Sequence, residues 1–487
     1  MDVIWYALTA LVLILTTCIL FYLYGPAGYP EPPLLGGALP ILRNAYTFLK
    51  EKNSSDLYDL MVYTGVDSLE KGGVIKIDNV LPFMTHYVIT DPDDLLTVSN
   101  SSNKHYFYNV FYARLKDSIF NHLPLDETWK TNRKQMSVAF TPKSIKNLTP
   151  VMNRCGRQLC EAWAAEGGKP FEHLETVHLA VYCAVAGDDV DIALARDYID
   201  VTSSVEDALS RRLCSFFMHF DIFFNLTSVG RKHNEECEYV NSLCRKIIRD
   251  KKERIKSPEY TGPKSVTDYI IQFCDFDDDD ELMGEVNTII TAGYTTTSSS
   301  LTSLFMLLGT HPEAQEKLYQ ELQSVLGSSE RDIVMEDLER LPYLDAVVKE
   351  SVRLYPAAPI VFRYSEKPYV LKNFTIPPKR FYAINLYGAN RHQVWGPDSF
   401  EFKPERWLDP KMLPPAHAFT SFMLGKRDCV GKRYGLSSMK IMTVHVVKRY
   451  KIFSDISKCQ FKIGVIMRPA TGGIIRVEER NPRTTNI

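Results

Sequence analysis

Residues 3–24 form an unbroken hydrophobic run without a charged side chain. A helix of about 22 residues is roughly 33 Å long, which is enough to cross a hydrocarbon core of about 30 Å. No basic stretch precedes the run, it exceeds the usual apolar length of a signal peptide, and no A-x-A site follows it. We therefore expect residues 1–24 to be a retained transmembrane anchor and not a cleaved signal.

The rest of the chain changes pattern several times. Residues 25–42 are rich in proline and glycine, which end a helix and favour a stiff, extended linker. Residues 126–355 show mostly helical periodicity, whereas short β-like runs lie at 73–90, 369–385 and 461–477. The acidic run 277–281 is expected to begin a long helix, since carboxylates suit a helix N-terminus. The pattern predicts a mainly α fold with a small β region, in one domain over residues 43–487.

Composition narrows the class of protein. The chain has 487 residues, of which 45% are hydrophobic, and a formal net charge of -2. No global basic field favours nucleic acid as a partner. Ten cysteines form no CxxC pair and no zinc spacing with histidine, so we expect reduced thiols and a body that faces the cytosol. Asp2 before the anchor and Arg43, Lys50 and Lys52 after it favour the same orientation.

One cysteine stands in an unusual setting. The segment 421–435 reads SFMLGKRDCVGKRYG and places Cys429 between Gly425 and Gly431. The glycines let backbone N–H groups and a flat partner approach, and Arg427 adds a cation that favours the thiolate. The residues alone leave three interpretations open: a buried thiol, a nucleophile or a metal ligand. A nucleophile also needs a base close in space, which a ligand does not.

The same segment resembles the haem-binding signature of the cytochrome P-450 family, F-x-x-G-x-R-x-C-x-G. Phe422, Gly425, Arg427, Cys429 and Gly431 occupy every fixed position of that signature. The resemblance implies the cytochrome P-450 fold and haem b, iron protoporphyrin IX, as cofactor. It also implies that Cys429 is the ligand of the haem iron, with Phe422, Arg427 and Gly431 in the haem-binding loop.

A second segment, KESVRLYP, resembles the E-x-x-R motif of the family through Glu350 and Arg353. An exposed ion pair at this spacing is the simpler interpretation. A helical projection instead places both residues on the apolar face, where a charged pair needs further partners. Arg406, in FEFKPERW, matches the third member of this group. By resemblance the three residues stabilise the fold around the haem and do no chemistry.

Further arginines are expected at the edge of the haem. Trp129 and Arg133, in TWKTNRKQ, resemble the W-x-x-x-R motif of the family, although a surface stacking pair would look the same. The resemblance implies that both hold a haem propionate, and Arg363 and Arg427 fit the same task. Arginine suits it because its planar fork binds a carboxylate through two hydrogen bonds.

The segment NTIITAGYTTTSSS resembles the family's A-G-x-[DE]-T-T motif, which crosses above the iron. Ala292, Gly293, Thr296 and Thr297 fit, whereas Thr295 occupies the acidic position. The resemblance assigns Thr296 a catalytic hydroxyl that steadies proton delivery. The alternative is a buried Ser/Thr-rich helix whose hydroxyls bond the preceding turn. The missing carboxylate puts the usual relay in doubt, and ordered water or Thr295 could substitute for it.

Ala292 also bears on how the haem is attached. Some members of the microsomal branch carry at this position a glutamate that esterifies the haem. Because an alanine cannot do so, we expect the haem to be held only by Cys429 and by non-covalent contacts, with Ala292 beside it. The aromatic-rich segment 105–115 and residues 357–361 stand where the family has its substrate loop and a second pocket wall.

Taken together, the resemblance implies a monooxygenase that inserts one atom of O2 into a hydrophobic, lipid-like or xenobiotic substrate. The strip LERLPYLDAVVKESVRLYP looks most like the branch of insect detoxifying enzymes and fatty-acid hydroxylases. No flavin or nicotinamide fingerprint is present, so electrons must come from outside the chain. The resemblance implies NADPH–cytochrome P-450 reductase as the donor, with cytochrome b5 as a second one. The expected location is the endoplasmic reticulum membrane. The reductase would dock on a basic patch, for which scattered solvated charges are the alternative: Lys426, Lys432, Arg433 and Lys440.

Two other functions are compatible with the same motifs. Thr295 in the acidic position keeps open an oxygen-independent isomerase or dehydratase built on the same haem-thiolate body. A non-catalytic haem or lipid carrier is the second alternative, because a fold does not by itself guarantee activity. Consumption of NADPH coupled to product would exclude the first.

Overall fold

The computed structural model describes residues 30–38, 44, 53–78, 85–100, 103–104, 118–122 and 126–480, with positions 12, 13, 16, 108 and 115. Most of the expected anchor, residues 1–24, and most of the aromatic-rich segment 105–115 therefore lie outside the described residues. Within the described part, no helix combines the length and the apolar character that a membrane crossing needs. Part of the expected linker is described. Within it, Leu34 forms an isolated parallel β-bridge with Lys76.

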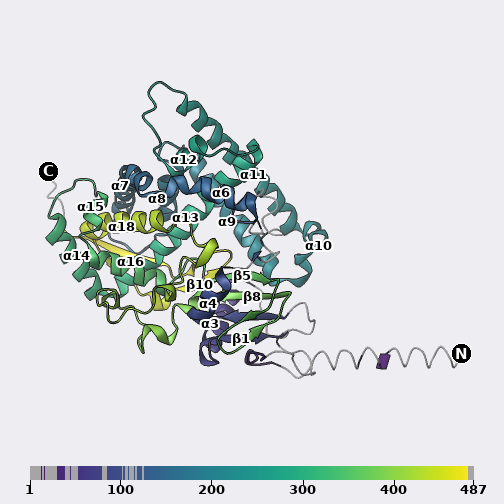
Figure 1. The fold of residues 1–487 in the computed structure, drawn as a ribbon. Helices are drawn as coiled ribbons and strands as arrows, with labels where there is room; N and C mark the ends of the chain where they lie inside the picture. The colour runs from purple at the N-terminus through teal and green to yellow at the C-terminus, as the bar shows by residue number, and fades with distance from the viewer. Residues whose placement is uncertain are drawn as a thin grey trace.

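Helices make up most of the described chain, as the sequence predicts for residues 126–355 (Figure 1). The α-helices are α3 (Ser54–Glu70), α4 (Pro92–Ser99), α6 (Glu127–Met136), α7 (Pro142–Ala164), α8 (Leu174–Ala186), α9 (Ile192–Cys214), α10 (Asp221–Leu226), α11 (Ser228–Ile255), α12 (Val266–Phe273), α13 (Asp279–Thr310), α14 (Pro312–Leu326), α15 (Met335–Leu338), α16 (Pro342–Leu354), α17 (Leu386–Ala389) and α18 (Lys432–Arg449). The short 3₁₀ helices are η3 (Ser137–Phe140), η4 (Phe216–His219), η5 (Gln393–Trp395), η6 (Pro404–Trp407), η7 (Ala416–Ala418), η8 (Gly425–Arg427) and η9 (Ile456–Lys458).

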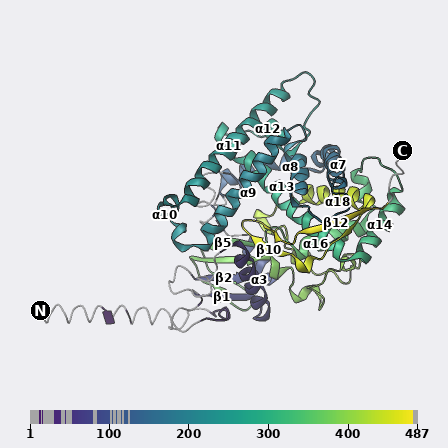
Figure 2. The ribbon, with the colours of Figure 1, turned by 180° about the vertical axis from the view of Figure 1, so that it is seen from behind.

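The strands form a small β region, seen at the lower part of Figure 2. They are β1 (Val74–Ile77), β2 (His86–Ile89), β3 (Asn103–Lys104), β4 (Phe171–Glu172), β5 (Ile360–Ser365), β6 (Tyr369–Val370), β7 (Thr375–Ile376), β8 (Arg380–Asn385), β9 (Tyr450–Phe453), β10 (Gln460–Ile463), β11 (Met467–Thr471) and β12 (Ile474–Glu479). The largest sheet has the order β1-β2-β8-β5-β3, in which only β2 and β8 run parallel. All three β-like runs of the sequence contain strands, and β3, β4, β5 and β9 were not predicted.

Helix α13 lies at the centre of the helical part (Figure 1) and packs against α8, α11 and α18. It begins in the acidic run, as predicted: the Asp278 carboxylate accepts a hydrogen bond from the N–H of Glu281 at 2.7 Å and caps the helix. Most of its side chains are buried in the main hydrophobic core, which also receives α7 and α18. The core therefore fixes α13 next to the N-terminal end of α18, which directly follows Cys429.

Candidate functional site

The loop that carries Cys429 is held by its own backbone and by the end of α4. The N–H of Cys429 donates to the carbonyl of Phe422 at 2.9 Å. Gly425 has a φ of 73°, and a side chain there would lie 2.6 Å from the Asn100 Oδ1 atom. Only glycine accommodates both this conformation and this contact. The fixed glycine of the signature thus sets the path of the loop as it turns towards Cys429.

The Cys429 thiol belongs to an interior surface. Its accessible area is that of an exposed residue, yet protein atoms surround it, so it faces a space inside the molecule. Burial raises the pKa of the thiol, whereas the N–H of Gly431 and the cations of Arg133 and Lys432 lower it. The largest cationic effects on Cys429 thus come from Arg133 and Lys432, and not from Arg427 as the sequence suggested.

On α13, the predicted residues also meet interior space. Ala292 is exposed and Thr296 is half-buried, although Thr295 and most of the helix around them are buried. The Thr296 hydroxyl donates to the carbonyl of Ala292 at 2.7 Å, and the Thr295 hydroxyl donates to the carbonyl of Thr291 at 2.7 Å. Both hydroxyls thus make the bond to the preceding turn that the alternative interpretation expected.

Trp129, Arg363 and Arg427 gather at one place. The Arg427 guanidinium lies 4.6 Å from the centre of the Trp129 ring and donates to the carbonyl of His122 at 3.1 Å. Arg363, on β5, is 4% exposed and donates to the carbonyl of Phe362 at 3.0 Å. Burial and the nearby Arg363 lower the pKa of Arg427 to about 10. These side chains form a positively charged cluster, called the positive pocket below, which contains three of the four residues predicted to hold a propionate.

Arg133 takes a different partner. Its guanidinium donates to the Asp428 carboxylate at 2.8 Å and to the Asp428 carbonyl at 3.0 Å. This contact fastens α6 to the residue directly before Cys429. No local pattern predicts this contact, because 295 residues separate the two partners.

The pocket contains a cation that sequence reasoning missed. Lys104, on β3, lies opposite Arg363 on β5 in the antiparallel pair. Burial lowers its pKa well below the ordinary value, and the guanidinium groups of Arg427 and Arg363 lower it further. No motif marks Lys104, and only the pairing of β3 with β5 brings it to the site.

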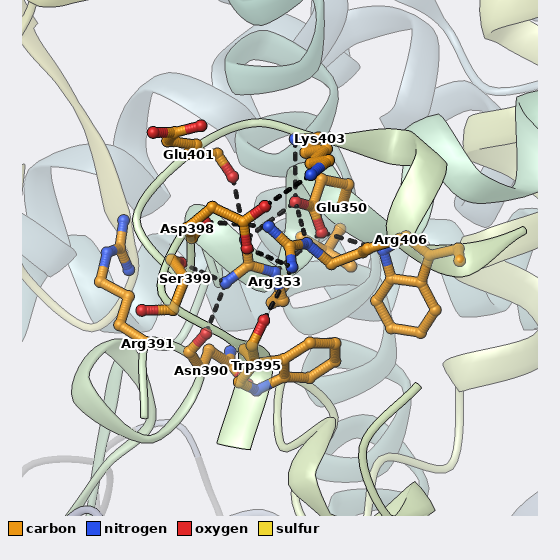
Figure 3. Close-up of polar contacts among 12 residues, drawn as sticks. Glu350, Arg353, Asn390, Arg391, Trp395, Asp398, Ser399, Glu401, Lys403 and Arg406 are labelled. Atoms are coloured by element: carbon orange, nitrogen blue, oxygen red, sulfur yellow. Dashed lines mark hydrogen bonds and ion pairs between the residues drawn. The ribbon is translucent and has the colours of Figure 1, made fainter. Parts of the chain in front are cut away.

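Glu350, Arg353 and Arg406 form a closed ion network at the centre of Figure 3. Arg353 donates to both oxygens of Glu350 at 2.8 Å, and Arg406 donates to one of them at 2.8 Å. The three side chains are at most 1% exposed. The predicted burial and the predicted third partner are both confirmed, and the network is complete within the chain.

The predicted basic patch is partly confirmed as a surface. Lys426, Lys432 and Arg433 are exposed beside the Cys429 loop. Lys440 instead forms an ion pair with Asp345 at 2.5 Å, so its charge is already balanced.

Comparison with known proteins gives a consistent answer. The family model described as cytochrome P-450 matches residues 84–475. Cytochrome P-450 4V2 of Mus musculus is 24% identical over 477 residues, covering 92% of this chain and 90% of the relative. Cytochrome P-450 4c21 of Blattella germanica is 25% identical over 485 residues, covering 93% of both chains. Cytochrome P-450 4F12 of Homo sapiens is 26% identical over 443 residues, covering 84% and 83%.

The match extends over the loop of Cys429, helix α13, the ion network and the positive pocket. It carries with it haem b as cofactor and the use of O2, a hydrophobic substrate and electrons from a reductase partner. The isomerase and carrier alternatives gain nothing from it. This chain belongs to the cytochrome P-450 family and is a haem-thiolate monooxygenase.

Proposed function

We propose that this chain inserts one atom of O2 into a lipid-like or xenobiotic substrate, with Cys429 as the thiolate ligand of the haem iron. One observation carries the assignment of Cys429: its thiol faces interior space at the end of a loop whose path is set by Gly425 and by the hydrogen bond from the Cys429 N–H to the Phe422 carbonyl. A thiolate ligand favours cleavage of the O–O bond when the haem is bound. The sulfur atom of Cys429 is thus a suitable ligand for the haem iron.

The other side chains fit a haem with two carboxylates. Arg363 and Arg427 are buried cations, and Trp129 supplies a flat apolar wall. Arginine binds carboxylates through two hydrogen bonds, so these residues suit the propionates. Arg133 is proposed to act at the same edge, and its contact with Asp428 places it closer to the thiol side. Ala292, Phe422 and Gly431 keep side chains short or apolar around the ring.

Thr296 is proposed to steady proton delivery at the oxygen side. It is half-buried and borders the interior space next to Ala292, whereas Thr295 is buried and bonded to the Thr291 carbonyl. Thr295 has no acidic proton at neutral pH, so it does not replace the missing carboxylate as an acid. The Thr296 hydroxyl can accept a hydrogen bond from water while it donates to Ala292, and an ordered water therefore takes the place of the acid.

Electrons are proposed to arrive through the face beside the Cys429 loop. Lys426, Lys432 and Arg433 are exposed there, and complementary charge speeds the encounter with an acidic partner. NADPH–cytochrome P-450 reductase is the proposed donor, with cytochrome b5 as a second one. Lys440 contributes less, because Asp345 already balances its charge.

Attachment to the endoplasmic reticulum membrane is proposed from the apolar run 3–24 and from an exposed apolar surface. That surface lies on η4 and α10, at the outer edge of the molecule in both views (Figures 1 and 2). Phe217, Ile222 and Leu226 are 69%, 69% and 70% exposed there. Such a concentration of exposed apolar side chains is typical of a contact with lipid or protein. The end of α9, just before η4, bonds the carbonyl of Asn53, which follows the N-terminal segment.

The ligand assignment is tested by replacing Cys429 with alanine. We expect the purified wild type to contain haem, with the reduced, CO-bound spectrum of a thiolate ligand and with spectral shifts across a panel of lipids and xenobiotics. The Cys429→Ala variant should lose the thiolate spectrum, and most of the haem. Cys459→Ala, at a half-buried thiol on another surface, is the matched control. A thiolate spectrum that survives in Cys429→Ala would overturn the assignment.

The role of Thr296 is tested by the ratio of product to NADPH consumed. Thr296→Ala should raise peroxide release and lower this ratio several-fold, with the haem spectrum unchanged, because the proton chain loses its hydroxyl. Thr295→Ala is the control, since that hydroxyl is buried against its own helix. Equal coupling in Thr296→Ala and wild type would contradict the role, and product formed without O2 would favour the isomerase alternative.

A further inference from the structure

Arg391 is a buried arginine that the closed ion network does not include. It follows Asn390, whose carbonyl accepts a hydrogen bond from Arg353, yet its own guanidinium points away from the network (Figure 3). The Arg391 side chain is 6% exposed and forms no ion pair with a carboxylate of the described residues. Because arginine is rarely buried to this extent without a paired charge, this position needs an explanation.

The contacts of Arg391 within the chain are an aromatic ring and one carbonyl. The guanidinium carbon lies 3.6 Å from the centre of the Tyr387 ring, and one N–H donates to the Tyr387 carbonyl at 3.2 Å. Most other described arginines that stack on a ring also pair with a carboxylate, as do Arg212, Arg254, Arg353, Arg449, Arg476 and Arg480. Stacking therefore does not usually replace an ion pair in this protein, and the guanidinium of Arg391 keeps N–H donors for a further partner.

Three tyrosines from separate parts of the chain lie around Arg391: Tyr58 on α3, Tyr355 after α16 and Tyr387 on α17. The Tyr58 ring lies 6.5 Å from the Tyr387 ring and 5.6 Å from the ring of Phe461 on β10. The Tyr355 ring lies 5.3 Å from that of Phe461. Burial lowers the pKa of Arg391, and all three tyrosines act on it electrostatically, so they lie close to the guanidinium. The tyrosines are half-buried, and their hydroxyls form no hydrogen bond with a described residue.

One cation and three hydroxyls without partners are complementary to a single carboxylate. The guanidinium supplies the charge and paired N–H donors, and phenol hydroxyls can donate to the same oxygen atoms. The rings of Tyr58 and Phe461 add an apolar surface, which favours an acid with a hydrocarbon part over a small hydrated anion. The single charge of Arg391 also matches a monoanion better than a dianion.

We propose that Arg391 and the three tyrosine hydroxyls bind the carboxylate of an amphipathic organic acid at a site separate from the haem. The apolar part of the acid packs against the rings of Tyr58 and Phe461. The site is built by α3, α17, β10 and the residue that follows α16, and none of these carries a residue assigned to the cofactor or to oxygen chemistry. The bound acid links α3 and β10 to the segment that holds the closed network.

The test measures binding of dodecanoate to the purified holoenzyme by calorimetry, with the haem site blocked by an azole that ligates the iron. The wild type should bind one equivalent, and it should bind dodecan-1-ol, which has the same chain without the carboxylate, at least about tenfold more weakly. Arg391→Met should bind dodecanoate as weakly as dodecan-1-ol, because the charge-assisted bond is lost. Arg480→Met is the matched control and should bind dodecanoate like the wild type, since Arg480 lies 3.8 Å from the Tyr319 ring but pairs with Glu316.

Tyr58→Phe is a milder variant that keeps the ring and its packing and removes only the hydroxyl. It should weaken dodecanoate binding roughly fivefold, as for one lost hydrogen bond to a charged group, and leave binding of dodecan-1-ol unchanged. Equal affinity of the wild type and Arg391→Met for dodecanoate would overturn the inference, as would equal weakening in Arg480→Met. Inorganic phosphate that binds as tightly as dodecanoate would overturn the assignment to an amphipathic acid. The spectrum of the iron-bound azole shows separately whether the haem site is intact and blocked.

Discussion

Two buried clusters of arginine residues in this protein have opposite electrostatic designs. In the first, Arg353 and Arg406 share Glu350, and their other hydrogen bonds go to backbone carbonyls and, from Arg406, to the Asp398 carboxylate (Figure 3). In the second, Arg363 and Arg427 stand beside Lys104, and their described bonds go to carbonyl groups. The first cluster is complete within the chain, whereas in the second no carboxylate of the described residues pairs with Lys104 or Arg363, which suits the binding of an anion.

The difference separates a structural role from a binding role without reference to motifs. A buried charge with all its partners inside the protein stabilises one fold and offers nothing to a ligand. A group of buried like charges lowers the stability of the protein alone and stores that free energy for an anionic ligand. Arginine serves both purposes, so neither the residue type nor its burial predicts its role. The sign of the charge on its neighbours does.

The largest effect is expected from opening the closed network. In Glu350→Gln, Arg353 loses its carboxylate partner and Arg406 keeps only Asp398, while both stay buried, which costs about 3–5 kcal/mol of unfolding free energy. We expect little soluble holoenzyme, and an unfolding midpoint in urea that falls strongly in whatever is recovered. Glu127→Gln breaks an exposed pair with Lys130 at the same i,i+3 spacing and should change the free energy by less than about 1 kcal/mol. Similar losses in both variants would contradict the argument.

The closed network is also the part of the site that sequence predicts best. Helical periodicity places Glu350 and Arg353 on the apolar face of α16, and both are buried there. Helix periodicity is local information, so a single sequence carries it. Their polar partners come from residues 390–406, and the sequence predicted only Arg406 among them, through a motif.

The open cluster is less predictable because long-range pairing builds it. Arg363 lies on β5 and Arg427 on η8, and motifs predict both, but nothing near Lys104 in sequence shows that it will lie opposite Arg363. A two-residue strand leaves no periodicity to detect. The Arg133–Asp428 pair escapes prediction for the same reason. Local periodicity thus predicts which side chains are buried, and tertiary contacts decide what each buried charge meets.

Lowering the pH should affect the buried histidines at a higher pH than it affects the closed network. Burial raises the pKa of Glu350, but the two arginines more than offset this and hold the pKa low, so its contribution is lost only below about pH 4.5. Burial lowers the pKa of His445 to about 4. Between about pH 6.5 and pH 4 the unfolded chain therefore binds a proton that the folded chain does not. The free energy of unfolding thus decreases as the pH is lowered through this range.

We therefore expect the unfolding free energy to fall by about 2 kcal/mol for this histidine between about pH 6.5 and pH 5. Urea unfolding at both pH values measures the change. His445→Gln, which keeps a polar group near Asn153, should lose that part of the pH dependence. A change with pH as steep as that of the wild type would show that His445 titrates normally in the folded protein.

Removing one cation from the open cluster should weaken haem binding and leave the stability of the polypeptide nearly unchanged, whereas opening the closed cluster lowers that stability. Arg363→Met should speed haem loss roughly tenfold through the lost charge-assisted bond, while the unfolding midpoint of the polypeptide changes little, because a like-charge repulsion disappears with it. Haem absorbance and tryptophan fluorescence, followed in the same urea titration, separate the two. A large drop of the polypeptide midpoint with normal haem retention would assign Arg363 a structural role instead.

The smallest expected effect is that of salt, which should act on one cluster only. Raising NaCl from about 0.05 M to about 0.5 M shortens the range of electrostatic attraction, but partly buried charges are screened much less than exposed ones. Haem loss from the wild type should therefore accelerate by less than about threefold, and by less still in Arg363→Met, which would have one attraction fewer to screen. Haem transfer at both salt concentrations measures this. Because Glu350, Arg353 and Arg406 are at most 1% exposed, salt should not change the contribution of their network to the free energy of unfolding. A loss of folding stability in high salt would show that solvent ions reach the network.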